Sequence, residues 1–313
     1  MLGYVVKRLL SAVLIMWAVT TIVFFAMRIV PADPAEVVLG EYATPEALEN
    51  LRRAAGLDLP LLEQYQRFMA GVLQGDLGRS LITNQPVAEQ IAALFPYTLE
   101  LAVFSLLIGA AIGIPLGVLT AVKRDTWVDY LGRVFALSGF SFPAFYLGIL
   151  LLLLFSLKLE WLPIVHAFET YTWSERVINL ILPAASLGII QAAYITRLTR
   201  STMLEQLGMD YVRTARSKGL SARSVHYKHV LKNVMIPVIT AMGLYTGTIL
   251  GGAVLTETIF SRPGVGKLLV GAITQRDYTL IQSGLMVFAF IIVIVNLIVD
   301  LSYALFDPRV KYE

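Results

Sequence analysis

The chain has 313 residues, of which 57% are hydrophobic and 15% are charged, and its formal net charge is +3. Its mean hydropathy is +0.71, whereas a water-soluble domain carries about 25% charged residues. This composition excludes an ordinary soluble globular protein and predicts a protein embedded in a membrane. The absence of cysteine also excludes disulfide bonds and thiolate metal sites.

Six stretches without a charged residue are each long enough to cross a bilayer, which takes about 20 apolar residues. They cover residues 9–27, 101–122, 134–157, 177–196, 233–256 and 278–299. None shows the polar stripe at helical spacing that a buried helix of a soluble domain would carry. The first follows Lys7 and Arg8 but has no small-residue cleavage site after Met27, so we interpret it as a retained helix rather than a secretory signal. The prediction is an all-α polytopic membrane protein with about six transmembrane helices.

Residues 31–97 form a long connection after the first span and contain helix signals of their own. These signals are Thr44-Pro45-Glu46 closed by Gly56, a stretch from Pro60 to Gly75, and Pro86 ahead of residues 87–94. Leu61, Tyr65, Phe68 and Val72 recur at helical spacing, which favours packing over the alternative of a mobile acidic loop. We therefore expect a small helical cap, and divide the chain into residues 1–30, this cap at 31–97, and a core at 98–313.

A second long connection, residues 197–232, holds eight basic residues against Glu205 and Asp210. Its length and helix-compatible sequence predict short helices along the membrane surface that offer a docking face to a soluble partner. Binding of lipid headgroups is the alternative. By contrast, Trp161-Leu162-Pro163 after the third span is typical of an aromatic anchor at the membrane interface.

The basic residues predict the orientation, because Lys and Arg accumulate in cytoplasmic loops. If both termini are cytoplasmic, the inner segments hold 15 of the 25 basic residues and only seven of the 22 acidic ones. The inner net charge is then +8 and the outer net charge is −5. We predict a multi-pass protein of the inner (cytoplasmic) membrane, with both termini and residues 197–232 inside and residues 31–97 outside.

Residues 210–220 read Asp-Tyr-Val-Arg-Thr-Ala-Arg-Ser-Lys-Gly-Leu. This segment resembles the cytoplasmic coupling motif of ABC importer permeases, in the form of the dipeptide, oligopeptide, glutathione and nickel branch. The general motif is Glu-Ala-Ala, three residues, Gly, nine residues, then Ile-x-Leu-Pro. Gly219 matches the glycine, Ala215 the second alanine and Leu231 the leucine.

The sequence departs from the general motif at several positions. Arg213 replaces the glutamate, Thr214 the first alanine, and His229 and Lys232 stand where Ile and Pro would be, with the proline following at Pro237. These departures resemble the peptide branch rather than the sugar or amino-acid branches.

The resemblance extends over nearly the whole chain through further marks in the family's order and spacing. They are Pro31-Ala32-Asp33-Pro34, Gly75-Asp76-Leu77-Gly78, Ser141-Phe142-Pro143, Trp161-Leu162-Pro163, Leu182-Pro183-Ala184, Gly251-Gly252, Glu257, Pro263-Gly264-Val265-Gly266, Arg276-Asp277-Tyr278, residues 296–300 and Asp307-Pro308-Arg309.

The resemblance implies a type I permease fold and a division of labour among subunits. A coupling helix around residues 211–221 would sit in a groove on a separate ATP-binding subunit, with Gly219 turning the chain sharply at the helix end. The implied coupling residues are Asp210, Tyr211, Arg213, Thr214, Ala215, Lys218, Gly219, Leu220 and Ser221. The implied partners are a second permease subunit, two ATP-binding subunits, an extracytoplasmic solute-binding protein and membrane lipid, with no nucleic acid. The transported solutes would be peptides or peptide-like molecules, with glutathione or nickel complexes as the alternative.

The chain itself lacks a phosphate-binding loop. Gly264-Val265-Gly266-Lys267 is similar to the end of one, but Ser261 replaces the first glycine and Leu268 the residue that would hold magnesium. We therefore expect no enzyme activity and no cofactor in this chain, and place ATP and magnesium in the partner ATPase subunits.

Glycines at four-residue intervals predict close helix contacts in the membrane. They are Gly243, Gly247 and Gly251 on the fifth span and Gly113 with Gly117 on the second. Packing within the chain and a seam to a second subunit both remain open, as does whether that subunit is a copy of this chain.

An ion-coupled secondary transporter or channel is the rival function, and it needs ionisable groups at mid-membrane. The spans lack them, because Glu100, Glu257 and Asp300 lie near span ends, where pairing with an arginine or with backbone is expected. His226 and His229 lack the further ligands of a metal site, and we interpret them as surface residues.

Overall fold

The computed structural model describes residues 2–29, 36, 39, 43–54, 56–163 and 172–306. Within this part of the chain the regular structure is helical, and the one extended pairing is an isolated antiparallel bridge between Arg79 and Pro86. The chain divides into two compact units. Unit 1 consists of Met1–Val5, Thr98–Arg262 and Val295–Glu313, and unit 2 consists of Val6–Tyr97 and Pro263–Ile294.

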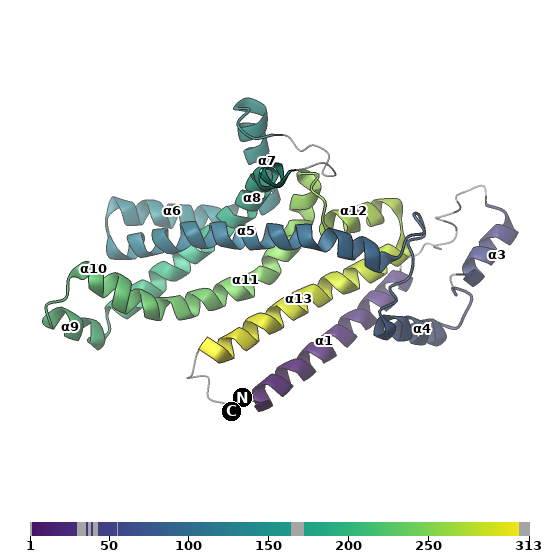
Figure 1. Cartoon of the computed structure of the whole chain (residues 1–313), viewed down its shortest axis with the longest axis horizontal. Coiled ribbons are helices and arrows are strands. Elements are labelled where there is room, and N and C mark those ends of the chain that lie inside the picture. The colour runs from purple at the N-terminus through teal and green to yellow at the C-terminus, as the bar shows by residue number, and fades with distance from the viewer. Residues whose placement is uncertain are drawn as a thin grey trace. The chain divides into compact units, whose positions relative to one another are not determined.

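Five helices in the described residues are long and apolar enough to cross a membrane (Figure 1). They are α1 (Leu2–Ile29), α5 (Val87–Val122), α8 (Trp173–Leu207), α11 (Leu231–Ile259) and α13 (Tyr278–Phe306). Each contains one of the predicted apolar stretches, so the prediction of a polytopic α-helical membrane protein is confirmed.

The third apolar stretch, residues 134–157, is bent, and the described residues hold six spans if the bent pair counts as one. It forms α6 (Trp127–Ser141), α7 (Ala144–Leu151) and the π-helical turn η1 (Leu152–Lys158). The segments Trp127–Gly139 and Ala144–Lys158 are bent by 107°. The cause is Pro143, because a proline ring disfavours helical backbone at the residue before it. Phe142 is accordingly extended, with φ −113° and ψ 129°.

Unit 2 contains two of the three short helices predicted for residues 31–97. They are α3 (Pro45–Ala54) and α4 (Leu61–Gln74), and α4 ends at Gly75 in the left-handed conformation. The third predicted helix, at residues 87–94, is instead the first part of α5. Unit 2 also holds α12 (Val265–Gln275), a short apolar helix that the sequence reading did not predict.

The aromatic face of α4 packs against α1 within unit 2. The Phe24 ring lies edge-on to Tyr65, with ring centroids 5.2 Å apart, and stacks on Phe68 at 5.6 Å. The Tyr65 and Thr21 hydroxyls are hydrogen-bonded at 2.8 Å. The expectation of a packed face is thus confirmed for Tyr65 and Phe68, whereas Leu61 remains 48% exposed.

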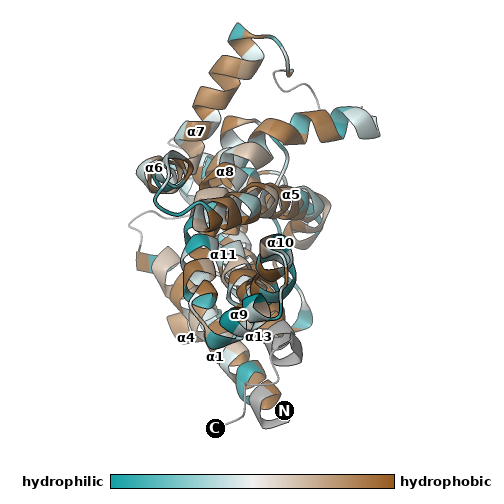
Figure 2. Ribbon diagram, turned by 90° about the vertical axis from the view of Figure 1, so that its left-hand side faces the viewer, coloured by the Kyte–Doolittle hydropathy of each residue, from teal (hydrophilic) through white to brown (hydrophobic). Residues whose placement is uncertain are grey.

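In unit 1, α8 is the central helix and contacts α6, α7 and α11. It begins at a capping box, in which Thr172 Oγ1 accepts from the Glu175 N–H while the Glu175 carboxylate accepts from the Thr172 N–H. Figure 2 shows that α7 is mainly hydrophobic whereas α9 (Asp210–Ser217) is hydrophilic. The hydrophilic helix α9 is therefore the candidate functional surface of unit 1.

Candidate functional site

Helix α9 is short and amphipathic, and this pattern fixes which of its faces is free. Val212 and Ala215, three residues apart, are buried, whereas Arg213, Thr214 and Arg216 are exposed. Because residues three apart share a helix face, the helix buries one stripe and presents a basic face.

Helix α9 ends at Ser217, earlier than the predicted residue 221, and the next residues form a turn. The Gly219 N–H donates to the Arg216 carbonyl at 2.9 Å and the Leu220 N–H donates to the Ala215 carbonyl at 3.4 Å. These two bonds form a Schellman motif, which requires a left-handed residue just past the helix. Gly219 supplies it with φ +78°.

After this turn the chain enters a second helical segment. Ser221 Oγ accepts from the Ser224 N–H at 3.3 Å and caps α10 (Ala222–Ser224), which continues through η3 (Val225–Val230) into α11. Leu220 and Ser221 therefore lie in the connection between two helices rather than on α9 itself.

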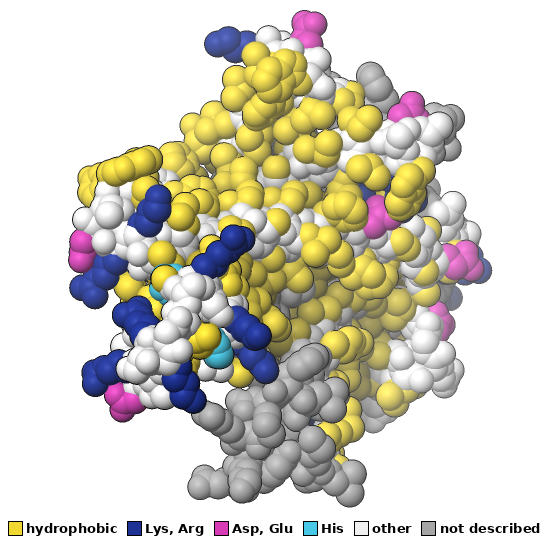
Figure 3. All heavy atoms as spheres, turned by 60° about the vertical axis from the view of Figure 1, so that its left-hand side comes forward, with side chains coloured by type: hydrophobic (Ala, Val, Ile, Leu, Met, Phe, Trp, Pro, Cys, Tyr) yellow, Lys and Arg dark blue, Asp and Glu magenta, His cyan; other side chains and the backbone are white. Residues whose placement is uncertain are grey.

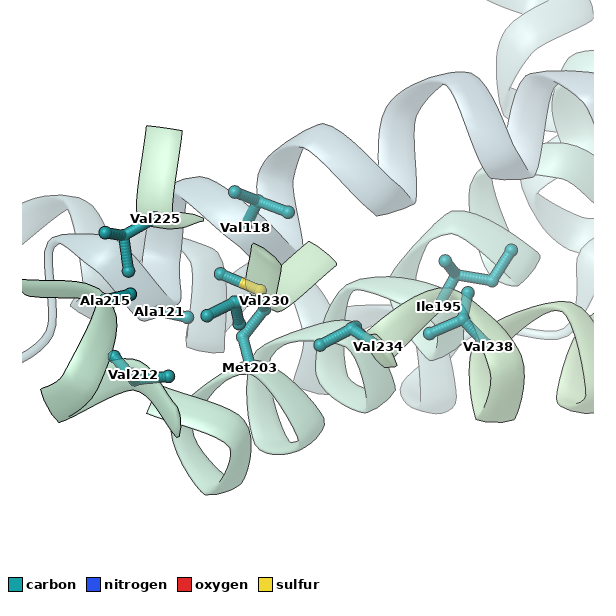
Figure 4. Packing of buried hydrophobic residues seen from close by; sticks show 10 residues of the cluster. All are labelled: Val118, Ala121, Ile195, Met203, Val212, Ala215, Val225, Val230, Val234 and Val238. Atoms are coloured by element: carbon teal, nitrogen blue, oxygen red, sulfur yellow. The ribbon is translucent and has the colours of Figure 1, made fainter. Parts of the chain in front are cut away.

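An apolar cluster fixes α9 to the ends of the long helices in unit 1 (Figure 4). Its members are Val118 and Ala121 of α5, Ile195 and Met203 of α8, Val212 and Ala215 of α9, Val225 and Val230 of η3, and Val234 and Val238 of α11. Partly buried Tyr211 packs against this cluster and donates its hydroxyl to Gln206 Oε1 at 3.0 Å. A displacement of α9 is therefore resisted by the ends of three long helices.

Basic side chains surround the free face of α9 and α10. Figure 3 shows Lys and Arg gathered at this end of unit 1. The exposed basic residues are Arg213, Arg216, Lys218, Arg223 and Lys228. Arg213 and Asp210 form an ion pair at 3.4 Å, with side chains 79% and 93% exposed, so the pair contributes little to stability. In the described residues no three His, Cys, Asp or Glu side chains form a metal-binding group, and this includes His226 and His229.

The predicted glycine contacts of the second span lie within the chain. A Cβ atom on Gly113 would lie 2.7 Å from Ile195 Cβ, and one on Gly117 would lie 2.5 Å from Thr199 Cβ. Gly109, which the sequence reading did not include, faces Gln191 in the same way at 2.7 Å. The three glycines meet three α8 residues that are also four apart, so α5 and α8 lie in close contact.

The fifth-span glycines behave differently from one another. A Cβ atom on Gly243 would lie 2.3 Å from Val299 Cγ1 of α13, so this glycine also packs within unit 1. Gly247 is partly buried, and Gly251 is exposed, with nothing within 4 Å of its Cβ position.

The acidic groups near the span ends are paired, as predicted for Glu100. Its carboxylate accepts from both nitrogens of the Arg176 fork and, at 2.9 Å, from Arg262 Nη2. Glu257, fully buried, accepts from the Thr98 hydroxyl at 2.6 Å. Burial lowers the pKa of the Arg262 guanidinium, whereas the carboxylates of Glu100 and Glu257 raise it. The Asp300 side chain lies outside the described residues.

Two sequence marks that are far apart in the chain meet in unit 2. Asp277 accepts from the Ser80 hydroxyl at 2.5 Å and from the Leu81 N–H at 3.2 Å. Ser283 donates to the Leu77 carbonyl at 2.7 Å. These bonds join the segment after Gly75 to the start of α13 within unit 2. The marks at residues 31–34 and 307–309 lie outside the described residues.

A cavity of about 510 Å³ lies beside these bonds in unit 2. Arg28 lies at its wall, where its guanidinium donates to Gln64 Oε1 at 3.1 Å and Gln282 Oε1 at 2.8 Å. Its central carbon also lies 3.5 Å from the centroid of the Phe24 ring. These contacts join α1, α4 and α13 within unit 2.

Several apolar spans, a bent third apolar stretch and a basic amphipathic helix packed on the span ends define a polytopic membrane protein. The chain belongs to the family of binding-protein-dependent transport system inner membrane components. The family match covers residues 113–312, and the N-terminal segment of the same family matches residues 1–102.

The relatives identify the branch within this family. The chain is 42% identical to a dipeptide transport system permease protein of Alkalihalophilus pseudofirmus. It is 41% identical to a glutathione transport system permease protein of Escherichia coli O6:H1. Each match covers the full length of this chain and of the relative. An inward-facing structure of a methionine ABC transporter matches with a TM-score of 0.56 at 16% identity, and covers 69% of this chain and 95% of that chain. The protein is thus an ABC importer permease of the dipeptide and glutathione type, with a type I permease fold.

Proposed function

We propose that this chain and a second permease subunit together form a path through which peptides or peptide-like solutes are taken up. Two separate ATP-binding subunits drive the process, and an extracytoplasmic solute-binding protein delivers the solute. The observation that carries the proposal is α9, whose basic face is free while its buried face holds the ends of α5, α8 and α11. A partner that displaces α9 would therefore act on three long helices at once.

The coupling residues have four different roles under this proposal. Arg213, Thr214 and Lys218 form the face that contacts the ATPase, and Asp210 opens the helix. Tyr211 and Ala215 hold α9 to the membrane helices, whereas Gly219, Leu220 and Ser221 set the turn that ends it. ATP and magnesium belong to the partner ATPase.

The proposed orientation places both termini and α9 in the cytoplasm. The chain is divided, as proposed from its sequence, into residues 1–30, 31–97 and 98–313. Residues 31–97 then lie outside, and α3 and α4 are the landing surface for the binding protein. Gly251, which is open in this chain, is the glycine available for contact with the second permease subunit.

Dipeptides and glutathione are the two candidate solutes, because the relatives are named as permeases for them. Proteoliposomes that contain the complete importer should take up one of them only when ATP and loaded binding protein are present. The purified chain alone should neither transport nor hydrolyse ATP. Uptake driven by an ion gradient without ATP would contradict the proposal.

A further inference from the structure

Asp129 of α6 and Arg200 of α8 form a buried ion pair in unit 1. Arg200 Nε and Nη2 donate to the two carboxylate oxygens at 2.6 and 2.8 Å. The Asp129 side chain is fully buried and that of Arg200 is 21% exposed. The Asp125 N–H also donates to Asp129 Oδ2 at 3.1 Å. A bidentate pair of this kind adds geometric specificity to the contact between two helices, because both donors of the guanidinium fork must face both carboxylate oxygens.

The pair lies one helical turn from the cluster that holds α9. Met203, three residues after Arg200, is fully buried in that cluster. None of the ten buried members of the cluster comes from α6. Two positions of α8 that are three residues apart therefore make the two contacts: Met203 packs in the cluster that holds α9, and Arg200 pairs with Asp129 of α6.

Stability alone does not account for a charged pair at this position. A buried ion pair is often no more stabilising than well-packed apolar residues of similar volume, because both charges lose their hydration. What it supplies is a fixed geometry, which a helix joint requires.

We propose that Asp129 and Arg200 are a positioning pair, which we call the α6–α8 joint. When α9 is displaced, the pair makes α6 move together with α8. The displacement is thereby transmitted to the bent third apolar stretch, of which α6 is the first part. This inference rests on the proposed docking of α9 to an ATPase. It assigns to the pair the transmission of movement and not contact with solute or ATP.

The first test compares uptake and ATP hydrolysis in the same preparation of the complete importer. We expect Asp129→Asn to leave ATPase association and hydrolysis within about twofold of wild type, but to lower solute taken up per ATP about tenfold, a typical magnitude for coupling between sites. Arg200→Lys keeps the charge but not the fork and should be intermediate. The double exchange Asp129→Arg with Arg200→Asp should couple better than either single exchange.

Arg133→Gln is the matched control. Arg133 lies 3.7 Å from Asp129 Oδ1 but its side chain is half exposed, so its removal should leave the ratio unchanged. If Asp129→Asn prevents assembly and the double exchange does not restore it, the pair has only a structural role and the proposal is wrong. Arg200→Lys with a wild-type ratio would also overturn it.

A second test measures the movement directly in this cysteine-free chain. Spin labels on Tyr130→Cys of α6 and Ser217→Cys of α9, both exposed positions, report the distance between the two helices. In the wild-type background we expect this distance to stay the same when ATP is trapped, whereas Asp129→Asn should shift or broaden it. An equal change in both backgrounds would overturn the joint. Absence of ATP-driven uptake by the wild-type importer would instead refute the proposed function.

Discussion

A substitution at Gly219 would act through one physical effect, the conformation of the backbone. Its φ is +78°, and nothing lies within 4 Å of the position that a Cβ atom would take. A side chain added here meets no neighbour, so the cost of a substitution comes from the left-handed conformation itself. The residue after α9 is therefore constrained by its backbone conformation and not by packing.

Gly219→Val should uncouple the importer without preventing membrane insertion. A β-branched residue tolerates positive φ badly, and the strain is on the order of 1–3 kcal/mol. The Schellman bonds would be lost and α9 displaced, whereas the spans remain held by the bilayer. We expect normal insertion, loss of uptake, and weaker ATPase association or hydrolysis that no longer responds to loaded binding protein.

Gly219→Asn is the matched control, because asparagine adds a side chain yet tolerates the left-handed region. It should retain most of the uptake. Arg213→Ala should do less harm than Gly219→Val, since the Arg213 charge is largely exposed and its pair with Asp210 is weak. Full uptake with normal ATPase docking in Gly219→Val would contradict the coupling role of this turn.

Glu100→Gln should destabilise unit 1, because Glu100 accepts from both Arg176 and Arg262. Loss of one partner of a buried ion pair costs roughly 3 kcal/mol at the lower end of the usual range, which suits a carboxylate that keeps 26% exposure. Thermal unfolding of the detergent-solubilised protein measures the effect. The control Glu63→Gln breaks an exposed pair with Arg67 and should change little. Equal thermal unfolding midpoints for Glu100→Gln and Glu63→Gln would refute the stabilising role of the Glu100 ion pairs.

Single residues differ in how far the sequence predicts their environment. Gly219 was predictable, since a glycine after an amphipathic turn is the usual helix terminator. Asp129 was not, because an acid in a basic inner segment indicates topology only, and its partner Arg200 is far away in sequence. Pairings such as Asp277 with Ser80 depend on the tertiary fold and leave no local pattern.

At the scale of elements, α5 and α8 show how glycine spacing becomes a helix interface. Gly109, Gly113 and Gly117 each lie against an α8 side chain, at distances that leave no room for a methyl group. In a bilayer there is little hydrophobic force between helices, so close van der Waals contact provides much of the attraction. The contact also fixes the position of α8 along α5, next to the cluster that holds α9.

Gly117→Ala should weaken this interface. Its Cβ atom would lie 2.5 Å from Thr199 Cβ and 2.8 Å from the Thr196 carbonyl, so the helices must separate. Overpacking of this kind costs about 1–3 kcal/mol. We expect a lower thermal midpoint and, where the protein still assembles, lower uptake.

The control is Gly271→Ala in α12, where a Cβ atom meets nothing within 4 Å. This exchange removes a glycine from a helix interior and should be neutral or slightly stabilising. If Gly117→Ala is equally neutral, the α5–α8 contact is looser than described.

The elements themselves were largely predictable, with two instructive exceptions. Apolar length identified the spans, because the bilayer imposes one requirement on all of them. The bend at Phe142 was not predicted, because the search for uncharged stretches takes no account of the backbone restriction that Pro143 imposes on the residue before it. Helix α12 was missed since its 11 residues are too few for a span.

At the scale of the whole molecule, the charge asymmetry of the loops predicts orientation. Five of the 15 basic residues predicted to lie inside are exposed around α9 and α10. Lys and Arg are retained on the cytoplasmic side during insertion. The same charges then serve a second role, because they face the ATPase under the proposed function.

Labelling of single cysteines should establish the orientation, since the chain has no cysteine of its own. Lys218→Cys lies beside α9 and should react with a membrane-impermeant maleimide only after the cells are opened. Leu73→Cys on α4, at a side chain 83% exposed, should react in sealed cells. Both positions are exposed in this chain, and uptake serves as the check that each variant is folded and still docks its ATPase. Labelling of position 218 from outside, in a variant that still transports, would overturn the topology and with it the assignment of α9 as the ATPase-facing helix.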